Sequence, residues 1–128
     1  MKKEALILVL DDDPDICTMI TMMLKYNGYA AADANNEEDA IKILHAKHID
    51  LVIMDMLLSG VNGTDVCRRL KQDKKTSSIP VLMFSAHPNA KGACFAAGAD
   101  DFIAKPFEMN DIMAKIHFFV NEKQVKQR

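Results

Sequence analysis

The chain has 128 residues, of which 49% are hydrophobic, and a formal net charge of −2 at pH 7. This length fits one domain, and the charge leaves no basic footprint for direct nucleic-acid binding. No apolar run is long enough to span a bilayer, no secretory cleavage pattern follows Met1, and Cys17, Cys67 and Cys94 lack metal-type spacing; we therefore predict a cytoplasmic protein without membrane contact, with free thiols.

The first half of the chain alternates short apolar runs with helical patterns. Strands are predicted over residues 5–10, 29–33 and 51–55. Asp13 before Pro14 predicts the start of a helix that runs to about Tyr26, and Asn36 predicts the start of a second helix. A third helix is expected to begin near Gly63. The predicted inner face of the first helix contains Ile16, Met19, Ile20, Met23 and Leu24, while Met22 falls outside.

The second half continues the same alternation. A strand is predicted over residues 80–84, followed by a weak helix over about 89–97 with Gly92 near its middle, and a last strand over 101–104. The fifth helix has an apolar stripe formed by Met109, Ile112, Met113, Ile116, Phe119 and Val120. We predict one domain over residues 1–122 and a polar tail over 123–128.

Five strand–helix alternations predict an α/β fold with a parallel sheet and right-handed crossovers. The strands end in polar residues, and the carboxyl ends of parallel strands lie at the same edge of a sheet. The topology is therefore expected to gather three carboxylates, a hydroxyl and an ammonium group, from Asp11, Asp12, Asp55, Ser85 and Lys105.

Three clustered carboxylates repel one another unless a cation joins them. Oxygen ligands suit Mg²⁺, with Mn²⁺ as the alternative. A lysine and a hydroxyl beside the metal can bind a phosphoryl group. Asp55, alone on its strand, is the predicted nucleophile that forms an acyl phosphate, and Asp11 and Asp12 are predicted to hold the metal.

These residues, in this order at strand ends, together with Gly63, Lys105-Pro106 and the Gly98-Ala99-Asp100 turn, resemble the receiver domains of two-component response regulators over nearly the whole chain. The resemblance implies a flavodoxin-like, doubly wound sheet in the order 2-1-3-4-5 with five helices on both faces. It implies that Asp55 accepts a phosphoryl group from a sensor histidine kinase or a histidine phosphotransfer protein, and that the protein is a signalling domain rather than a classical enzyme. Mg²⁺ would be bound by Asp12, Asp55 and the backbone carbonyl of Leu57, with Asp11 acting mainly through water, while Ser85 and Lys105 would contact the phosphoryl oxygens. The Lys105-Pro106 peptide would be cis.

The resemblance also assigns regulatory positions. Phe102 matches the aromatic residue that moves inward when the Ser85 hydroxyl moves toward the phosphate. Leu57 and His87 match positions that tune the attack of water, and because apolar Leu57 cannot orient a water molecule, slow self-dephosphorylation is expected. Met22 and Phe118 are candidate interface residues for the phosphodonor and for an unknown downstream target, and a homodimer through the fourth helix, fifth strand and fifth helix is a further expectation.

Other functions remain open from the sequence. The chain could be a phosphorelay shuttle or the isolated receiver of a larger regulator. The Asp11-x-Asp13 pattern after a strand resembles the start of haloacid-dehalogenase-like phosphatases, in which the first acid is the nucleophile. A phosphate-independent binding module with a relict pocket is the third class.

Overall fold

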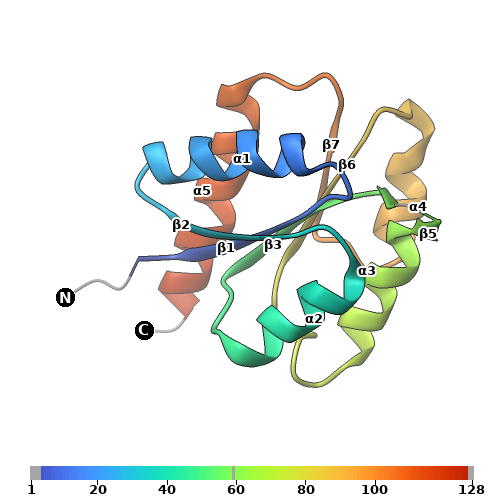
Figure 1. Cartoon of the computed structure of the whole chain (residues 1–128), viewed down its shortest axis with the longest axis horizontal. Coiled ribbons are helices and arrows are strands. Elements are labelled where there is room, and N and C mark those ends of the chain that lie inside the picture. Colours follow the sequence, from blue (N-terminus) through green and yellow to red (C-terminus); the bar gives the residue numbers. More distant parts are fainter. Residues whose placement is uncertain (1–3, 59, 127–128) are drawn as a thin grey trace.

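A single five-stranded parallel sheet forms the centre of the computed structural model, which describes residues 4–58 and 60–126. The strand order is β2-β1-β3-β6-β7 (Figure 1). Since β6 and β7 are the fourth and fifth strands predicted from the sequence, the predicted order 2-1-3-4-5 is confirmed. The strands are β1 (Leu6–Leu10), β2 (Ala30–Ala34), β3 (Leu51–Asp55), β6 (Val81–Ser85) and β7 (Asp101–Ala104).

Helices cover both faces of this sheet and enclose two hydrophobic cores (Figure 1). One core lies beneath α1 and α5, and the other lies beneath α2, α3 and α4. The predicted doubly wound architecture is therefore confirmed. The helices are α1 (Pro14–Tyr26), α2 (Glu37–Ala46), α3 (Gly63–Gln72), α4 (Lys91–Ala96) and α5 (Met109–Lys126).

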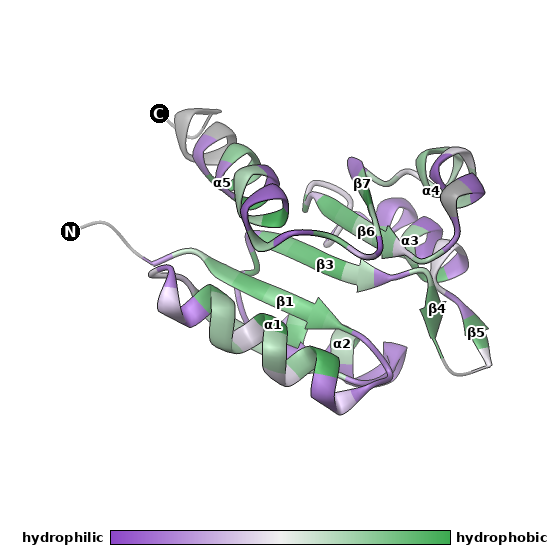
Figure 2. Ribbon diagram, turned by 90° about the horizontal axis from the view of Figure 1, so that it is seen from above, coloured by the Kyte–Doolittle hydropathy of each residue, from purple (hydrophilic) through white to green (hydrophobic). Residues whose placement is uncertain are grey.

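The central strands are apolar along their length because both of their faces are covered (Figure 2). In β3 the first four residues, 51–54, are buried, and only Asp55 at the end of the strand is half-buried. The buried run therefore holds the carboxylate at the edge of the sheet.

Two methionines that the helical pattern placed inside are half-exposed. Met19 is 47% exposed, and Cys17 takes a fully buried place in α1 instead, because the stripe facing the sheet is centred on residues 17, 20 and 24 and leaves Met19 at its border. Met109, in the first turn of α5, is 48% exposed, since it lines an open groove with Tyr26 at the end of α1.

Two local features differ from the sequence prediction. A short antiparallel hairpin, β4 (Leu57–Leu58) with β5 (Val61–Asn62), occupies the predicted loop after β3. The predicted helix over 89–97 is a 3₁₀ turn, η1 (Pro88–Ala90), followed by the six-residue α4, in which Gly92 lowers the helix propensity.

The last helix crosses the boundary predicted between the domain, residues 1–122, and the tail, residues 123–128. Helix α5 continues to Lys126, into the segment 123–128 that the sequence predicts as a tail. Residues 1–3 of the predicted domain and 127–128 of the predicted tail lie outside the described residues, so the boundary stays a prediction. Within residues 4–58 and 60–126, no helix has the length and apolarity needed to cross a bilayer.

Candidate functional site

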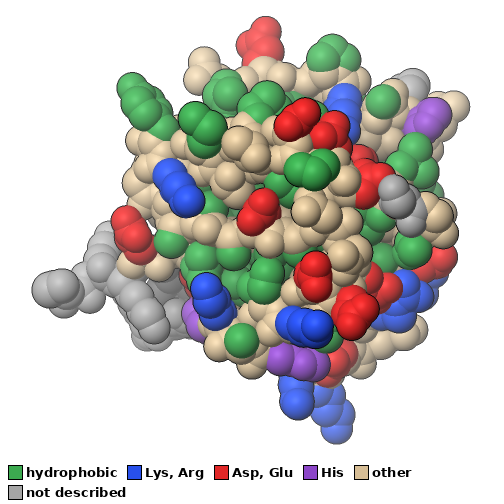
Figure 3. Space-filling model, viewed as in Figure 1, with side chains coloured by type: hydrophobic (Ala, Val, Ile, Leu, Met, Phe, Trp, Pro, Cys, Tyr) green, Lys and Arg blue, Asp and Glu red, His purple; other side chains and the backbone are tan. Residues whose placement is uncertain are grey.

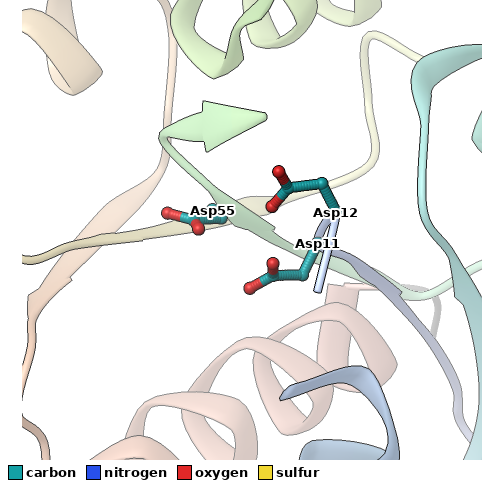
Figure 4. Close-up of side chains that lie close together, drawn as sticks. All are labelled: Asp11, Asp12 and Asp55. Atoms are coloured by element: carbon teal, nitrogen blue, oxygen red, sulfur yellow. The ribbon is translucent and has the colours of Figure 1, made fainter. Parts of the chain in front are cut away.

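Three carboxylates meet at the carboxyl edge of the sheet (Figure 4). Asp11 and Asp12 follow β1, and Asp55 ends the neighbouring strand β3. One oxygen from each side chain lies within 4.8 Å of the others. The α/β topology alone produces this approach, because β1 and β3 are parallel neighbours whose ends coincide.

Asp11 is the buried member of the group, with 1% of its surface exposed. Its Oδ1 accepts a hydrogen bond from the backbone N–H of Asp13 at 2.9 Å. Its Oδ2 is buried and has no hydrogen-bond partner among the described residues. Burial, reinforced by the nearby charge of Asp55, raises the pKa of Asp11 to about 6. This oxygen therefore needs a proton or a cation.

The donor set decides which cation fits. All three side chains offer hard carboxylate oxygens, and no histidine or cysteine ligand joins the group within the described residues. Mg²⁺ prefers oxygen ligands, takes few from the protein and retains water in the remaining positions. The residues present therefore fit Mg²⁺.

A lysine approaches the trio from the last strand. Lys105, which follows β7, places its Nζ 3.5 Å from Oδ2 of Asp55. The ammonium also lies 4.6 Å from the centroid of the Phe84 ring, which restricts its position. The Lys105-Pro106 peptide is cis, as the resemblance implied. The site thus contains the ammonium group of Lys105 next to the Asp55 carboxylate, with the carboxylates of Asp11 and Asp12 nearby.

Ser85 ends β6, between the strands that carry Asp55 and Lys105. The residue is 1% exposed, and its Oγ accepts a hydrogen bond from the backbone N–H of His87 at 3.1 Å. His87 itself is exposed. Phe102, on β7, is 8% exposed and packs in the core beneath α2, α3 and α4, so its ring lies inward here.

The loop after Asp55 is tied back to the start of α3. The N–H of Gly63 donates to the carbonyl oxygen of Met56 at 2.6 Å. A Cβ atom at Gly63 would lie 2.4 Å from the carbonyl oxygen of Asp55. Leu57, 54% exposed, donates its N–H to Oδ1 of Asp55 at 3.3 Å. Glycine is therefore required at position 63 by close approach of two backbone segments.

Asp13 does not join the trio. It is an exposed N-cap residue of α1, whose Oδ1 accepts a hydrogen bond from the N–H of Asp15 at 2.9 Å. The second acid of the Asp11-x-Asp13 pattern is thus turned toward the helix. This placement disfavours the haloacid-dehalogenase reading, which leaves Asp55 unexplained.

The two candidate interface residues are both on the surface: Met22 is 65% exposed and Phe118 is 59% exposed. Acidic side chains gather on the side of the molecule where β1 and β3 end (Figure 3, right half, viewed as in Figure 1). Negative charge therefore surrounds the edge of the sheet at which the carboxylates meet.

Sequence reasoning missed Asn35. This residue lies between β2 and α2, and its Nδ2 donates to the backbone carbonyl of Asp11 at 2.9 Å. The only sequence signal was a second asparagine directly before the helix-capping Asn36. Its contact depends on the pairing of β1 with β2, which periodicity does not specify.

Comparison with known protein families gives a match over most of the chain. The model of the response regulator receiver domain matches residues 7–117. The DNA-binding response regulator MtrA of Mycolicibacterium smegmatis is 35% identical over 112 residues, which are 86% of this chain and 48% of that protein. The phosphate regulon transcriptional regulatory protein PhoB of Pseudomonas aeruginosa is 35% identical over 112 residues, 86% of this chain and 49% of that protein. The chain spans about half the length of the curated relatives it matches.

Solved structures show the same fold. A putative response regulator from Chloroflexus aurantiacus superposes with a TM-score of 0.87 at 32% identity, covering 93% of this chain and 99% of that chain. The receiver domain of sensor histidine kinase PA1611 from Pseudomonas aeruginosa, solved with a magnesium ion coordinated in its active-site cleft, superposes with a TM-score of 0.83 at 22% identity and covers 93% and 99% of the two chains. At 22% identity, the similarity to the PA1611 receiver domain supports the fold alone.

Proposed function

The chain belongs to the response regulator receiver domains of two-component phosphorelay signalling, and from this premise we propose that Asp55 is its phosphoacceptor. The observation that carries the proposal is the group of three carboxylates beside Lys105, in which Asp11 keeps a buried oxygen without a partner. Receiver domains are signalling domains rather than classical enzymes, and in the proposed role the phosphorylated Asp55 is itself the signal.

In the proposed reaction, a carboxylate oxygen of Asp55 attacks the phosphorus of a phosphohistidine. The new P–O bond forms as the P–N bond breaks, and the leaving imidazole takes up a proton. Lys105, already 3.5 Å from Asp55, neutralises charge on the transferred group. The Ser85 hydroxyl accepts from the His87 N–H and keeps its own hydrogen to donate to a phosphoryl oxygen.

Asp12, Asp55 and the backbone carbonyl of Leu57 are the proposed Mg²⁺ ligands, with Asp11 acting mainly through water. A bound Mg²⁺ would supply charge neutralisation between the acids and the phosphoryl oxygens. The buried Oδ2 of Asp11 supports this assignment, since it lacks a donor among the described residues. The magnesium found in the cleft of the PA1611 receiver is a parallel at the level of the fold.

Incubation with acetyl phosphate and Mg²⁺ tests the proposal directly. We expect the wild-type protein to gain the mass of one phosphoryl group, because acetyl phosphate is a small activated donor that needs no docking partner. The gain should be lost in Asp55→Asn and when Mg²⁺ is chelated, as measured by intact mass spectrometry. Asp13→Asn, which removes a neighbouring exposed acid, is the matched control and should be phosphorylated normally. An equal gain in Asp55→Asn would refute the assignment.

The phosphorylated protein is expected to lose its phosphoryl group slowly. Leu57 is 54% exposed beside Asp55, and its apolar side chain cannot orient an attacking water. Leu57→Asn should hydrolyse about tenfold faster, well below the roughly hundredfold that a fully positioned acid or base contributes. The decay is followed by intact mass after the donor is removed. His87→Ala serves as a control for any compensation by the imidazole, and a wild-type half-life of seconds would contradict the expectation.

The phosphodonor is proposed to be a sensor histidine kinase or a histidine phosphotransfer protein. A groove of about 410 Å³ beside Lys105 supports docking near Asp55. Met22, on the same helix as the groove residues Ile16 and Met19, is 65% exposed. The groove is lined by Ile16, Met19, Ala86, Lys105, Pro106 and Phe107.

The output is proposed to be a protein contact that depends on the phosphorylation state. Phe102 is the proposed switch residue, and the face of α4, β7 and α5, with exposed Phe118, is the proposed surface for a target or a second copy. The phosphorelay shuttle and the receiver of a larger regulator remain alternatives. MtrA, of which this chain covers 48%, is named a DNA-binding response regulator, so the absence of nucleic-acid contact stays a prediction.

A further inference from the structure

A set of contacts lies behind the acidic pair, where β2 passes into α2. The Asp11 N–H donates to the carbonyl oxygen of Ala34 at 3.2 Å, and the Asp11 carbonyl accepts from Nδ2 of Asn35 at 2.9 Å. Two consecutive residues at the end of the neighbouring strand thus hold both polar backbone groups of Asp11.

Cys17 lies beneath the same carbonyl. Its Sγ is 3.5 Å from the Asp11 oxygen and 3.6 Å from Nδ2 of Asn35. Burial raises the pKa of Cys17 to about 11, so the group is a neutral thiol at physiological pH. A thiol is a weak donor, and Asn35 therefore makes the strong hydrogen bond to this carbonyl.

We infer that Asn35 is a positioning residue for the metal site: its amide fixes the peptide plane between Asp11 and Asp12 and so sets the directions of both carboxylates. This inference rests on the proposed function and deepens it. The geometric reason is that the Asp11 carbonyl belongs to the peptide unit that joins the two acids. A displacement of that unit would shift the Cα atoms of both acids, and with them both carboxylates, relative to Asp55.

Outer contacts of this kind tune metal affinity without touching the metal. Loss of a group that orients a ligand commonly weakens metal binding by tenfold or more. We expect Asn35→Ala to weaken Mn²⁺ binding by about tenfold, as measured by electron paramagnetic resonance of free Mn²⁺ titrated with the protein. The variant should reach the wild-type phosphorylation rate at saturating Mg²⁺, with only the half-saturating Mg²⁺ concentration raised.

Asn36→Ala is the matched control. Asn36 is the same residue type one position later, and its Oδ1 accepts from the N–H of Asp39 at 2.8 Å to cap α2. Its loss weakens the helix start but leaves the Asn35 contact to the Asp11 carbonyl in place. Mn²⁺ affinity should therefore be unchanged in Asn36→Ala while its thermal stability falls.

Asn35→Asp separates geometry from charge. The carboxylate has the same shape as the amide but cannot donate to the Asp11 carbonyl. Added negative charge near the site would strengthen cation binding, whereas a lost donor weakens it, so the two effects have opposite signs. We expect weaker Mn²⁺ binding than in wild type, and tighter binding would overturn the inference.

The outcomes separate this inference from the proposed function. If the wild-type protein binds Mn²⁺ and the affinities of Asn35→Ala and Asn36→Ala for Mn²⁺ are equal, the positioning role of Asn35 is overturned and the proposed metal site is retained. No Mn²⁺ or Mg²⁺ binding by the wild-type protein would overturn the proposed metal site and the positioning role with it. If both Asn35 variants bind Mn²⁺ more weakly than the wild-type protein and Asn36→Ala binds it equally well, the positioning role of Asn35 is established.

Discussion

Asp11→Asn is expected to stabilise the metal-free protein by roughly 3 kcal/mol at pH 8. Burial holds the pKa of Asp11 at about 6, against an ordinary value of 3.8. One pKa unit corresponds to about 1.4 kcal/mol, so keeping this carboxylate ionised in the folded state is costly. Asparagine keeps the acceptor for the Asp13 N–H and removes the charge. Urea unfolding of both proteins in the presence of a chelator measures the difference.

The sign of the pH dependence follows from the same raised pKa. Between pH 4 and pH 6 the folded protein binds the Asp11 proton more tightly than the unfolded chain, so wild-type stability falls as the pH rises through this window. Below the ordinary pKa, both proteins are neutral at this position and should be equally stable. Above pH 6 the full difference should be present.

The metal provides a second readout. Wild-type stability should rise on addition of Mg²⁺, because a ligand that binds only the folded state stabilises it. Asp11→Asn should gain less, since part of the repulsion is already removed. Asp13→Asn, which removes an equal charge from an exposed cap, should behave as wild type. Equal stability of Asp11→Asn and Asp13→Asn at pH 8 would contradict the prediction.

Gly63→Ala is expected to destabilise the protein by roughly 2 to 3 kcal/mol, the upper range for extra atoms in a packed region. The new Cβ would lie 2.4 Å from the carbonyl oxygen of Asp55 and 2.7 Å from that of Met56. Both are backbone atoms, so relief requires the loop to move. Because this loop begins at Asp55, the phosphorylation rate with acetyl phosphate should fall together with the free energy of unfolding.

Gly92→Ala is the matched control for this prediction. Nothing lies within 4 Å of a Cβ at Gly92, which is in α4. Alanine favours a helix over glycine by about 0.5–1 kcal/mol, so this substitution should stabilise the protein. The two changes are chemically identical and have opposite expected signs. If Gly63→Ala unfolded at the same urea concentration as Gly92→Ala, close approach at position 63 would be excluded as the cause.

Much of the fold could be predicted because burial on both faces leaves a clear pattern. The apolar run before Asp55 indicated a central strand, and five such alternations indicated the parallel sheet. The cap residues Asp13 and Asn36 marked helix starts that the structure confirms. Prediction was weaker where local preference and packing compete: Met19 and Met109 were assigned to buried faces and are half-exposed.

Hydrophobic periodicity identifies which residues end the strands, and hence which side chains can share one edge of a parallel sheet. Which atoms meet at that edge depends on how the strands and loops pack against one another. Pairing of β1 with β2 brings Asn35 to the Asp11 carbonyl, and packing buries one Asp11 oxygen without a donor among the described residues. The reason is physical: periodicity reports which face of an element is buried, whereas contacts between elements depend on strand register and loop geometry, which no single segment encodes.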